Sequence, residues 1–310
     1  MVDLGVVIVT HNSREFLENC LASLNAGGIS TDVVVVDNSS TDGSVELIRE
    51  RFPGIRIIAN ASNRGFAAAN NEGFRYVQSR YILLLNPDTV VHGRALESLV
   101  SFMAEHPTAS AAGPAIRNRD GSPQRTGVRF PSNWNIFVEA LFLDRLFSNS
   151  RLFGAHKELY EDPAKARQVD YVQGSCLVVR NSVINNTGLL DERFFMYFEE
   201  TDWCYRMKQA GGEIWYSPVA SITHFGGDEF AHYDEQRLVA FHQSLMYFYQ
   251  KHHSKQSRVL LRMILVLRSL IRLAVWTPFL LFGEATSARA LSTLRGYLRV
   301  IPLVLSGRLS

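Results

Sequence analysis

The sequence contains few cysteines, and these lie far apart. Its 310 residues include three, Cys20, Cys176 and Cys204. Their odd number and wide spacing argue against a disulfide framework and against a structural zinc site. So few cysteines are typical of a protein that works in a reducing compartment.

The sequence also has no long uninterrupted apolar run. The first one, residues 4–9, follows Asp3 and lacks both a basic flank and a cleavage site, so we interpret it as a strand and not as a signal peptide. Arginines interrupt the apolar stretch 258–282, and its charge-free remainder, 273–282, is short and contains Pro278. This stretch is therefore a poor candidate for a transmembrane helix.

A strong net charge is missing too, because two opposite charges nearly cancel. The net charge is +2, yet residues 251–310 hold ten Lys/Arg and one acid, which gives +9 and leaves −7 for residues 1–250. An acidic body with a basic, apolar tail predicts a catalytic domain attached to an anionic surface, which we take to be a membrane and not a nucleic acid. The alternative is a solvated helical face.

Strand-length apolar runs alternate with amphipathic helical stretches over the first hundred residues. Strands are predicted at 4–9, 33–36, 55–59 and 81–85, and helices at 15–24, 44–52 and 66–77. The nearly continuous hydrophobicity of the strands predicts a sheet covered on both faces. This order predicts the α/β class with a doubly wound, mainly parallel sheet.

The remaining sequence is less regular at first. Residues 113–170 predict loops and short helices, followed by a strand at 169–180, a helix at 200–210, a strand at 213–216 and a helix at 234–251. We therefore expect one domain over 1–250 that consists of two halves, 1–112 and 113–250. Residues 251–310 would form a separate basic, amphipathic helical region.

Polar clusters follow the predicted strands at the sheet edge where ligands bind in such folds. They are Thr10-His11-Asn12-Ser13, the acidic and amide run 37–42, Asn63-Arg64-Gly65 and Asn86-Pro87-Asp88. A carboxylate at Asp37 can accept hydrogen bonds from a nucleobase or ribose, and Asp88 can bind a hard divalent cation beside phosphates. Either group can instead serve only a turn or a helix cap.

The densest constellation is residues 194–206, where aromatic residues lead into Glu199, Glu200 and Asp202 on a helix. Acids at a helix N-terminus can simply complement its dipole. Nearby aromatic side chains can also desolvate a carboxylate and raise its pKa toward neutrality, as a general base requires. His224 follows a predicted strand and is either structural or a third metal ligand, which would favour Mn²⁺ somewhat over Mg²⁺.

Five motifs occur in an order that resembles glycosyltransferase family 2, in particular its bacterial rhamnosyltransferase-like branch. They are Val-Ile-Val-Thr-His-Asn, Val-Val-Asp-Asn-Ser-Ser-Thr-Asp, Asn-Arg-Gly-Phe-Ala-Ala-Ala-Asn-Asn-Glu-Gly, Leu-Leu-Asn-Pro-Asp-Thr and Phe-Glu-Glu-Thr-Asp-Trp-Cys-Tyr-Arg. The resemblance covers roughly residues 4–230 and implies the GT-A fold. It also implies that 1–250 is a catalytic domain in which the half 1–112 binds the nucleotide sugar and the half 113–250 binds the acceptor.

The resemblance also implies roles for individual residues. Donor contacts are expected from Thr10, Asn12, Asp37, Asn38, Asn63, Arg64, Gly65 and Asp88. Asp88 would bind Mg²⁺ or Mn²⁺ with help from His224, and Glu200 would deprotonate the acceptor hydroxyl, with Glu199 and Asp202 as rival bases. Acceptor contacts are expected from Gly174, Ser175, Trp203 and Arg206.

The chain departs from the family pattern at two positions. The usual metal motif is Asp-x-Asp, and Asn86 stands in place of its first acid. The base position carries Glu200 where the family usually has Asp. Asp88 is therefore the only charged ligand that the motif offers.

The C-terminal stretch 258–282 predicts an amphipathic helix with Arg258, Arg262, Arg268 and Arg272 within an arc of roughly 120°. Such a helix suits the membrane interface, and a second basic, apolar stretch at 289–305 would lie beside it. The alternative is packing against the protein's own core or a homodimer partner.

Together these observations predict an inverting transfer of a sugar from a nucleotide-diphosphate donor to a polyprenyl-diphosphate-linked saccharide in cell-envelope polysaccharide synthesis. The resemblance points to dTDP-rhamnose as donor, and the expected location is the cytoplasmic face of the plasma membrane. The alternatives are a family member that uses another UDP-, GDP- or dTDP-sugar, a sugar nucleotidyltransferase, and a non-catalytic nucleotide-sugar sensor.

Overall fold

The structure, a computed structural model, describes residues 2–124, 126–154, 156, 161–226 and 235–307. The chain divides into two compact units. The first, the sheet unit, contains residues 1–129, 161–195 and 199–227, and the second, the helical unit, contains residues 130–160, 196–198 and 228–310.

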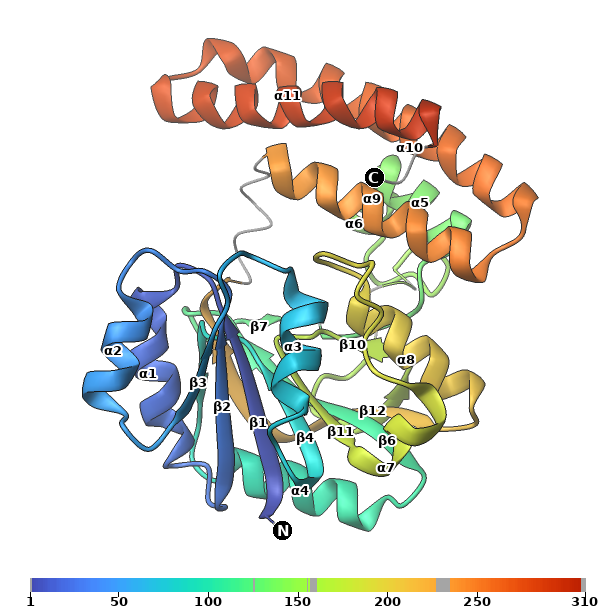
Figure 1. Cartoon of the computed structure of the whole chain (residues 1–310). Coiled ribbons are helices and arrows are strands. Elements are labelled where there is room, and N and C mark those ends of the chain that lie inside the picture. Colours follow the sequence, from blue (N-terminus) through green and yellow to red (C-terminus); the bar gives the residue numbers. More distant parts are fainter. Residues whose placement is uncertain (1, 125, 155, 157–160, 227–234, 308–310) are drawn as a thin grey trace. The chain divides into compact units, whose positions relative to one another are not determined.

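The first half of the sheet unit alternates strands and helices as the sequence predicts (Figure 1). Its elements are β1 (Val2–Thr10), α1 (Arg14–Leu24), β2 (Thr31–Asp37), α2 (Ser44–Arg51), β3 (Arg56–Ala59), α3 (Phe66–Phe74) and β4 (Ser79–Leu85). The four strands pair in parallel in the order β3-β2-β1-β4. The predicted α/β class with a mainly parallel, doubly wound core is confirmed.

The second half extends the same sheet with strands of mixed direction. Its elements are β5 (Thr89–Val91), α4 (Ala95–Glu105), β6 (Ala109–Arg117), β7 (Pro123–Gln124), β8 (Gly127–Val128), β9 (Arg167–Val169), β10 (Tyr171–Val172), β11 (Cys176–Arg180), α7 (Asn181–Thr187), α8 (Glu199–Gln209) and β12 (Glu213–His224). The sheet continues from β4 through β11, β6 and β12 to β5. Strand β11 runs antiparallel to both of its neighbours.

Three details of this half differ from the prediction. Strand β6 was not predicted, because it is rich in small residues; a side chain at Gly113 would meet Val172 at 2.9 Å, so close packing explains its composition. The predicted strand 169–180 is divided among β9, β10 and β11. Strand β12 continues to His224 past Pro218, and a register shift between Ser217 and Ser221 accommodates the proline.

Helices cover both faces of the sheet. Val6 and Ile8 on β1 belong to a buried cluster with Leu17 of α1 and Leu99 of α4. On the opposite face, Gly73 lets α3 approach β1 closely, since a Cβ there would lie 2.4 Å from Val7. Each fully buried aliphatic side chain contributes about 1.5–3 kcal/mol. All three cysteines are buried and form no disulfide.

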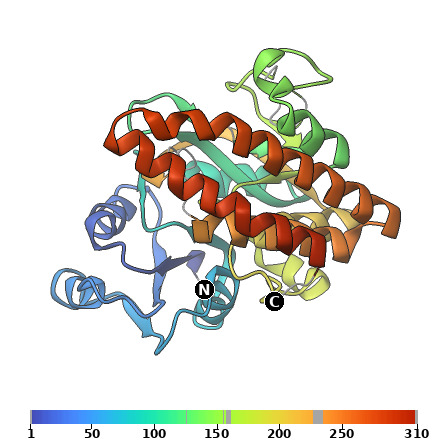
Figure 2. The same cartoon turned by 90° about the horizontal axis from the view of Figure 1, so that it is seen from above.

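The helical unit consists of α5 (Asn133–Ala140), α6 (Leu143–Leu146), α9 (Glu235–His252), α10 (Lys255–Trp276), the short 3₁₀ helix η2 (Thr277–Leu281) and α11 (Glu284–Ser306). Helices α10 and α11 lie side by side as a hairpin with η2 near its turn (Figure 2). The predicted helices 234–251, 258–282 and 289–305 correspond to α9, α10 and α11, although Asp234 lies outside the described residues. Within the described part of the chain, none of the helices has the length and hydrophobicity needed to cross a membrane.

The basic stripe predicted on α10 does not form one solvent-facing surface. Arg268 is 8% exposed and lies 4.0 Å from Glu139 of α5. Arg272 donates to the Glu139 carbonyl at 2.9 Å and stacks 3.6 Å from the centre of the Phe142 ring. These arginines pack inside the helical unit because α5 offers them a carboxylate, a carbonyl and an aromatic face. For them, the alternative of packing against the protein's own core is correct.

Candidate active site

Thr10 and Asp37 lie side by side where β1 and β2 end, since the strand register pairs these two residues. Asp37 is 2% exposed, and one of its oxygens accepts from the Ser40 N–H at 3.0 Å in a turn. Its other oxygen, Oδ1, and the buried Thr10 Oγ1 have no hydrogen-bond partner among the described residues. A buried polar atom without a partner is costly, so these oxygens mark a place for a ligand.

The side-chain amides in the neighbouring loops already form hydrogen bonds within the protein. The Asn38 side chain donates to Asn63 Oδ1 (3.1 Å) and to the Gly65 carbonyl (3.0 Å), and it accepts from Arg64 N–H (3.2 Å). Asn12 Oδ1 accepts from the next loop at Thr41 N–H, 2.8 Å away. Asn12, Asn38 and Asn63 therefore shape the loops around the crevice through these bonds.

Local contacts explain why the chain has Gly65 and Arg64 at these positions. Gly65 has φ +83°, and a Cβ there would lie 2.5 Å from the Phe195 carbonyl, so the close approach requires glycine. Arg64 pairs with Glu72 of α3 at 3.0 Å and stays partly exposed. The loop 63–65 is thus held at the edge of the sheet beside Asp37.

Asn86 and Asp88 occupy the turn between β4 and β5. Asn86 N–H donates to the Ser175 carbonyl at 2.9 Å, and Phe225 N–H donates to the Asp88 carbonyl at 2.9 Å, which ties the end of β12 to this turn. Asn86 Oδ1 and Asp88 Oδ1 are buried without a hydrogen-bond partner among the described residues. Asp88 Oδ1 lies 3.3 Å from His224 Nε2.

These residues fit a divalent cation. A carboxylate oxygen and an imidazole nitrogen converge at 3.3 Å, and both are ligands that Mn²⁺ accepts. A Cβ at Gly226 would lie 2.3 Å from Asp88 Oδ2, so the glycine leaves space beside the carboxylate. The described residues contain no cluster of three or more His, Cys, Asp or Glu that could hold a metal. A cation here would have to take its remaining ligands from a bound phosphate or water.

Three of the predicted residues on α8 stabilise the helix. Asp202 is fully buried and accepts from Arg206 Nε at 2.8 Å, while Arg206 also donates to the Leu189 carbonyl at 2.8 Å. Trp203 donates to the Gly188 carbonyl at 2.8 Å and stacks on Phe74, with ring centres 5.7 Å apart. These contacts fix α8 against the 187–189 segment.

Glu199 and Glu200 at the start of α8 have different surroundings. Glu199 is 5% exposed, its Oε2 has no partner among the described residues, and burial together with the charge of Glu200 raises the pKa of Glu199 well above its usual value. Glu200 is partly exposed, and burial raises the pKa of Glu200 to about 7. Tyr197 and Phe198, just before the helix, have φ of +70° and +66°, an uncommon conformation for aromatic residues that is often found at functional sites.

The loop before β11 connects these acids with the Asn86 turn. A Cβ at Gly174 would lie 3.6 Å from the Cβ and Cγ atoms of Glu200. The next residue, Ser175, accepts from Asn86 N–H through its carbonyl, and its buried Oγ has no partner among the described residues. Gly174 and Ser175 thus connect the surroundings of Glu200 with the Asn86 turn.

Sequence reasoning missed two residues of this site. Gln124 on β7 makes two hydrogen bonds to His224, and Gly226 provides the space beside Asp88. The His-Phe-Gly-Gly run could have indicated Gly226, because a glycine two residues after a candidate ligand permits close approach. Gln124 follows an ordinary Asp-Gly-Ser-Pro turn, and no sequence signal distinguishes it.

Known proteins resemble this chain over most of its length. Residues 5–185 match the family model described as "Glycosyl transferase family 2". An N-acetylglucosaminyl-diphospho-decaprenol L-rhamnosyltransferase of Mycobacterium tuberculosis is 30% identical over 272 residues, which cover 84% of this chain and 88% of the relative. Rhamnosyltransferase WbbL of Escherichia coli is 25% identical over 238 residues, or 74% and 84% of the two chains.

Solved structures share the fold. The mannosyltransferase PcManGT from Pyrobaculum calidifontis, in complex with GDP-Man and Mn²⁺, superposes with a TM-score of 0.56 at 15% identity and covers 99% of this chain and 87% of its own. GalNAc-T7 with UDP, GalNAc and Mn²⁺ gives a TM-score of 0.58 at 13% identity, with coverage of 100% and 58%. These structures show the fold alone. The family model and the relatives show that the chain belongs to glycosyltransferase family 2 and is a glycosyltransferase of the rhamnosyltransferase-like kind.

Proposed function

We propose that the protein transfers L-rhamnose from dTDP-rhamnose to a polyprenyl-diphosphate-linked saccharide, with inversion, during synthesis of a cell-envelope polysaccharide. The names of the relatives from M. tuberculosis and E. coli support the sugar, and the name of the M. tuberculosis relative also supports the lipid-linked acceptor. Sugar nucleotides are made in the cytoplasm, so the reaction would take place at the cytoplasmic face of the plasma membrane.

The single observation that carries this proposal is the environment of Glu200. The residue is half-buried, burial raises the pKa of its carboxyl group to about 7, and it lies next to Gly174 at the same sheet edge as the partnerless oxygens. A base with a pKa near the working pH transfers protons most effectively. Asp202 forms an ion pair with Arg206, and Glu199 is more deeply buried than Glu200. Glu200 is therefore the best-placed base of the three.

Glu200 would take the proton of the acceptor hydroxyl as that oxygen attacks the anomeric carbon. The bond from this carbon to the donor diphosphate breaks on the opposite face, which inverts the configuration. Asp37 and Thr10 would bind the nucleoside through their partnerless oxygens. Asp88 and His224 would hold a Mg²⁺ or Mn²⁺ ion, whose charge stabilises the leaving diphosphate when it is bound.

A donor panel tests the proposal. Purified protein is incubated with dTDP-rhamnose, UDP-N-acetylglucosamine or GDP-mannose, Mn²⁺, and an N-acetylglucosaminyl-diphosphate lipid, and the lipid products are analysed by mass spectrometry. We expect a mass gain of one deoxyhexose with dTDP-rhamnose, and loss of that product with EDTA. Transfer from another nucleotide sugar alone would contradict the proposed donor and leave the family assignment intact.

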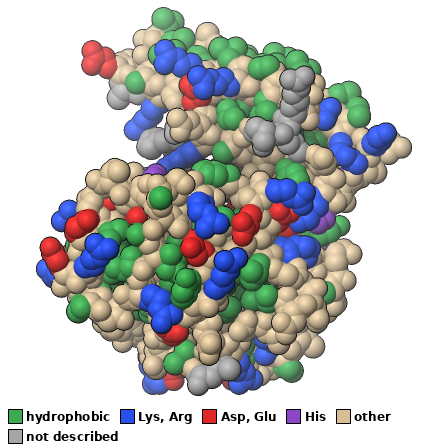
Figure 3. Space-filling view, viewed as in Figure 1, with side chains coloured by type: hydrophobic (Ala, Val, Ile, Leu, Met, Phe, Trp, Pro, Cys, Tyr) green, Lys and Arg blue, Asp and Glu red, His purple; other side chains and the backbone are tan. Residues whose placement is uncertain are grey.

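We further propose that the helical unit binds an anionic membrane surface. The α10–α11 hairpin exposes apolar side chains, among them Leu281 (88%) and Phe282 (61%) near its turn. The same hairpin also exposes basic side chains, namely those of Lys255, Arg262, Arg289 and Arg295. Figure 3 shows hydrophobic and basic side chains close together on this unit. An exposed apolar surface with surrounding cations is typical of proteins that lie in the membrane interface.

An apolar groove in the same unit extends this surface. It has a volume of about 450 Å³ and is lined by α5 and α10 through Asn133, Trp134, Phe137, Leu260, Met263, Ile264 and Leu267. Trp134 is 43% exposed and Met263 59% exposed, so the groove opens to the surface. An apolar chain of a lipid fits these properties better than a polar ligand does.

Vesicle binding tests the membrane proposal. A Leu281→Asp/Phe282→Asp variant should lose at least tenfold in affinity for phosphatidylglycerol vesicles, because each charge would have to enter the apolar boundary. The control is Val219→Asp, which places one such charge at an exposed apolar residue (57%) of β12 in the sheet unit. Equal binding by all three proteins would contradict the proposal.

A further inference from the structure

Gln124 makes two hydrogen bonds to the same residue, His224. Its Nε2 donates to the His224 carbonyl at 2.8 Å, and its Oε1 lies 3.1 Å from His224 Nδ1. Gln124 belongs to β7, which pairs with β6 through Ile116, and His224 ends β12, which pairs with the same strand. The sheet therefore holds both partners of this contact.

Elementary hydrogen-bond chemistry fixes where the imidazole proton lies. A backbone carbonyl can only accept, so the amide NH₂ group of Gln124 must face it. The remaining amide atom, Oε1, also only accepts, and a stable contact at 3.1 Å requires a proton on His224 Nδ1. The neutral ring then carries its lone pair on Nε2.

This lone pair points at a second acceptor. Nε2 lies 3.3 Å from Asp88 Oδ1, an oxygen that is buried and has no hydrogen-bond partner in the described part of the chain. Asn86 Nδ2 lies 3.5 Å from Nε2, which is long for a hydrogen bond. A lone pair and a carboxylate oxygen repel each other at this distance unless a proton or a metal cation lies between them, and on the neutral ring, whose proton is on Nδ1, a metal cation fills this role.

We infer that Gln124 is a positioning residue that sets the Nδ1–H tautomer of His224 and directs the Nε2 lone pair toward a divalent cation shared with Asp88. The inference rests on the metal-assisted transfer proposed above. Metal-bound histidines commonly donate their other ring N–H to an oxygen, and loss of that partner lowers metal affinity about 10–100-fold. Gln124 supplies that oxygen from a strand of the same sheet.

The first experiment measures the tautomer without metal. Long-range ¹H–¹⁵N correlation spectra of the metal-free protein are recorded at mildly alkaline pH, where imidazoles are neutral. We expect the Nδ1–H pattern for His224 in wild type and in Gln124→Glu, whose carboxylate still accepts from Nδ1. In Gln124→Met, which has a similar shape but no acceptor oxygen of comparable strength, the Nε2–H form should appear. An Nε2–H pattern in wild type would overturn the inference.

The second experiment measures Mn²⁺ affinity by electron paramagnetic resonance in the presence of dTDP. Gln124→Met should weaken binding about 10–100-fold, and Gln124→Glu should recover most of it. Gln168→Met, at an exposed glutamine of β9, serves as the matched control and should bind like wild type. Thermal unfolding of each variant confirms that it is folded.

The outcomes separate this inference from the proposed function. If Asp88→Asn weakens Mn²⁺ binding while Gln124→Met binds like wild type, Gln124 has no positioning role and the proposed metal site stands. If wild-type protein binds no Mn²⁺ with dTDP, the metal role in the proposed function fails, together with the inference built on it.

Discussion

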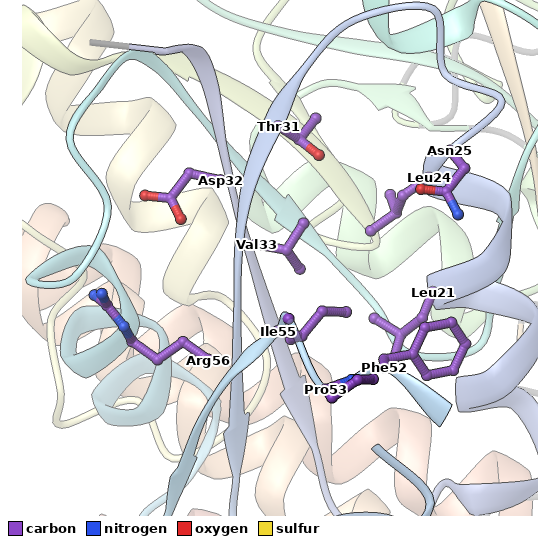
Figure 4. A pocket seen from close by; sticks show the side chains of 11 residues that line it. Leu21, Leu24, Asn25, Thr31, Asp32, Val33, Phe52, Pro53, Ile55 and Arg56 are labelled. Atoms are coloured by element: carbon purple, nitrogen blue, oxygen red, sulfur yellow. The ribbon is translucent and has the colours of Figure 1, made fainter. Parts of the chain in front are cut away.

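The two ends of β2 offer contrasting surroundings. At its amino end lies a hollow of about 640 Å³, lined in part by Thr31, Asp32 and Val33 (Figure 4). At its carboxyl end, about 20 Å away along the strand, Asp37 keeps a buried oxygen without a partner. Buried oxygens without a partner are also found at the end of β1 and in nearby loops, on Thr10, Asn86, Asp88 and Ser175. The residues that line the hollow include no such atom.

This difference shows that a large hollow need not contain buried polar atoms without hydrogen-bond partners. The amino-end hollow arises where α1, β2 and the 52–56 segment leave space at the surface, and its polar groups are solvated or partnered. The carboxyl edge holds buried polar atoms that folding has desolvated without giving them partners. Such atoms cost free energy unless a bound ligand provides them with partners.

The largest expected effect at the carboxyl edge comes from Glu200→Gln. The amide keeps the shape of the side chain but cannot accept a proton, so kcat should fall roughly 10²–10⁴-fold. Binding of dTDP-rhamnose, measured by isothermal titration calorimetry, should stay within about twofold of wild type, because the base acts on the acceptor. Turnover like that of wild type would shift the base to Glu199 or Asp202.

A smaller effect is expected from pH. Because burial raises the pKa of Glu200 to about 7, the base is protonated below that pH and ionised above it. The transfer rate should therefore fall about tenfold per pH unit below about 7 and level off above it. A rate that stays constant between pH 5 and 7, measured with saturating substrates, would exclude Glu200 as the titrating base.

A still smaller effect is expected from Glu199→Gln, and it concerns stability. The folded pKa of Glu199 lies well above the ordinary 4.5, so the wild-type protein loses stability as pH rises above 4.5 and the unfolded chain ionises. The variant avoids this loss, so its melting temperature should match wild type at pH 4 and exceed it by a few degrees at pH 8. The control is its kcat, which should remain near that of wild type. An equal or lower melting temperature at pH 8 would show that Glu199 is not buried as a neutral acid.

No effect is expected from Asp32→Asn at the amino-end hollow. The change removes one charge from a residue that lines this hollow and leaves the shape of the side chain intact. Donor affinity and kcat should both stay within about twofold of wild type. A tenfold loss in either would show that the hollow takes part in the reaction and would remove the contrast between the two edges.

Local sequence patterns predicted the first half of the fold because β1, β2 and β4 are covered on both faces and have nearly continuous apolar runs. The same patterns failed at β6, where packing against Val172 selects small residues that resemble a loop. They also failed for the arginines of α10. Helical periodicity placed Arg268 and Arg272 on one face but could not show that α5, more than a hundred residues earlier, would bind them.

For the site, the sequence indicated which polar clusters follow strands but not how each side chain is used. Asn38 and Asp37 are adjacent, yet Asn38 has its amide fully engaged by the 60–65 loop and Asp37 keeps one oxygen unused. Only tertiary contacts separate these two cases. The same holds for Asp202, whose partner Arg206 is visible in the sequence but whose complete burial is not.

Paramagnetic broadening by Mn²⁺ tests most directly which edge of the sheet binds the donor. Amide spectra of the deuterated protein are recorded with dTDP and either Mn²⁺ or diamagnetic Mg²⁺. We predict that Mn²⁺ broadens the amide signals of Asp88, Ser175 and Gly226 and leaves those of Asp32 and Gly54 sharp. Broadening at Asp32 and Gly54 without loss at Asp88 would contradict the account, because it would place the metal and diphosphate at the opposite end of β2.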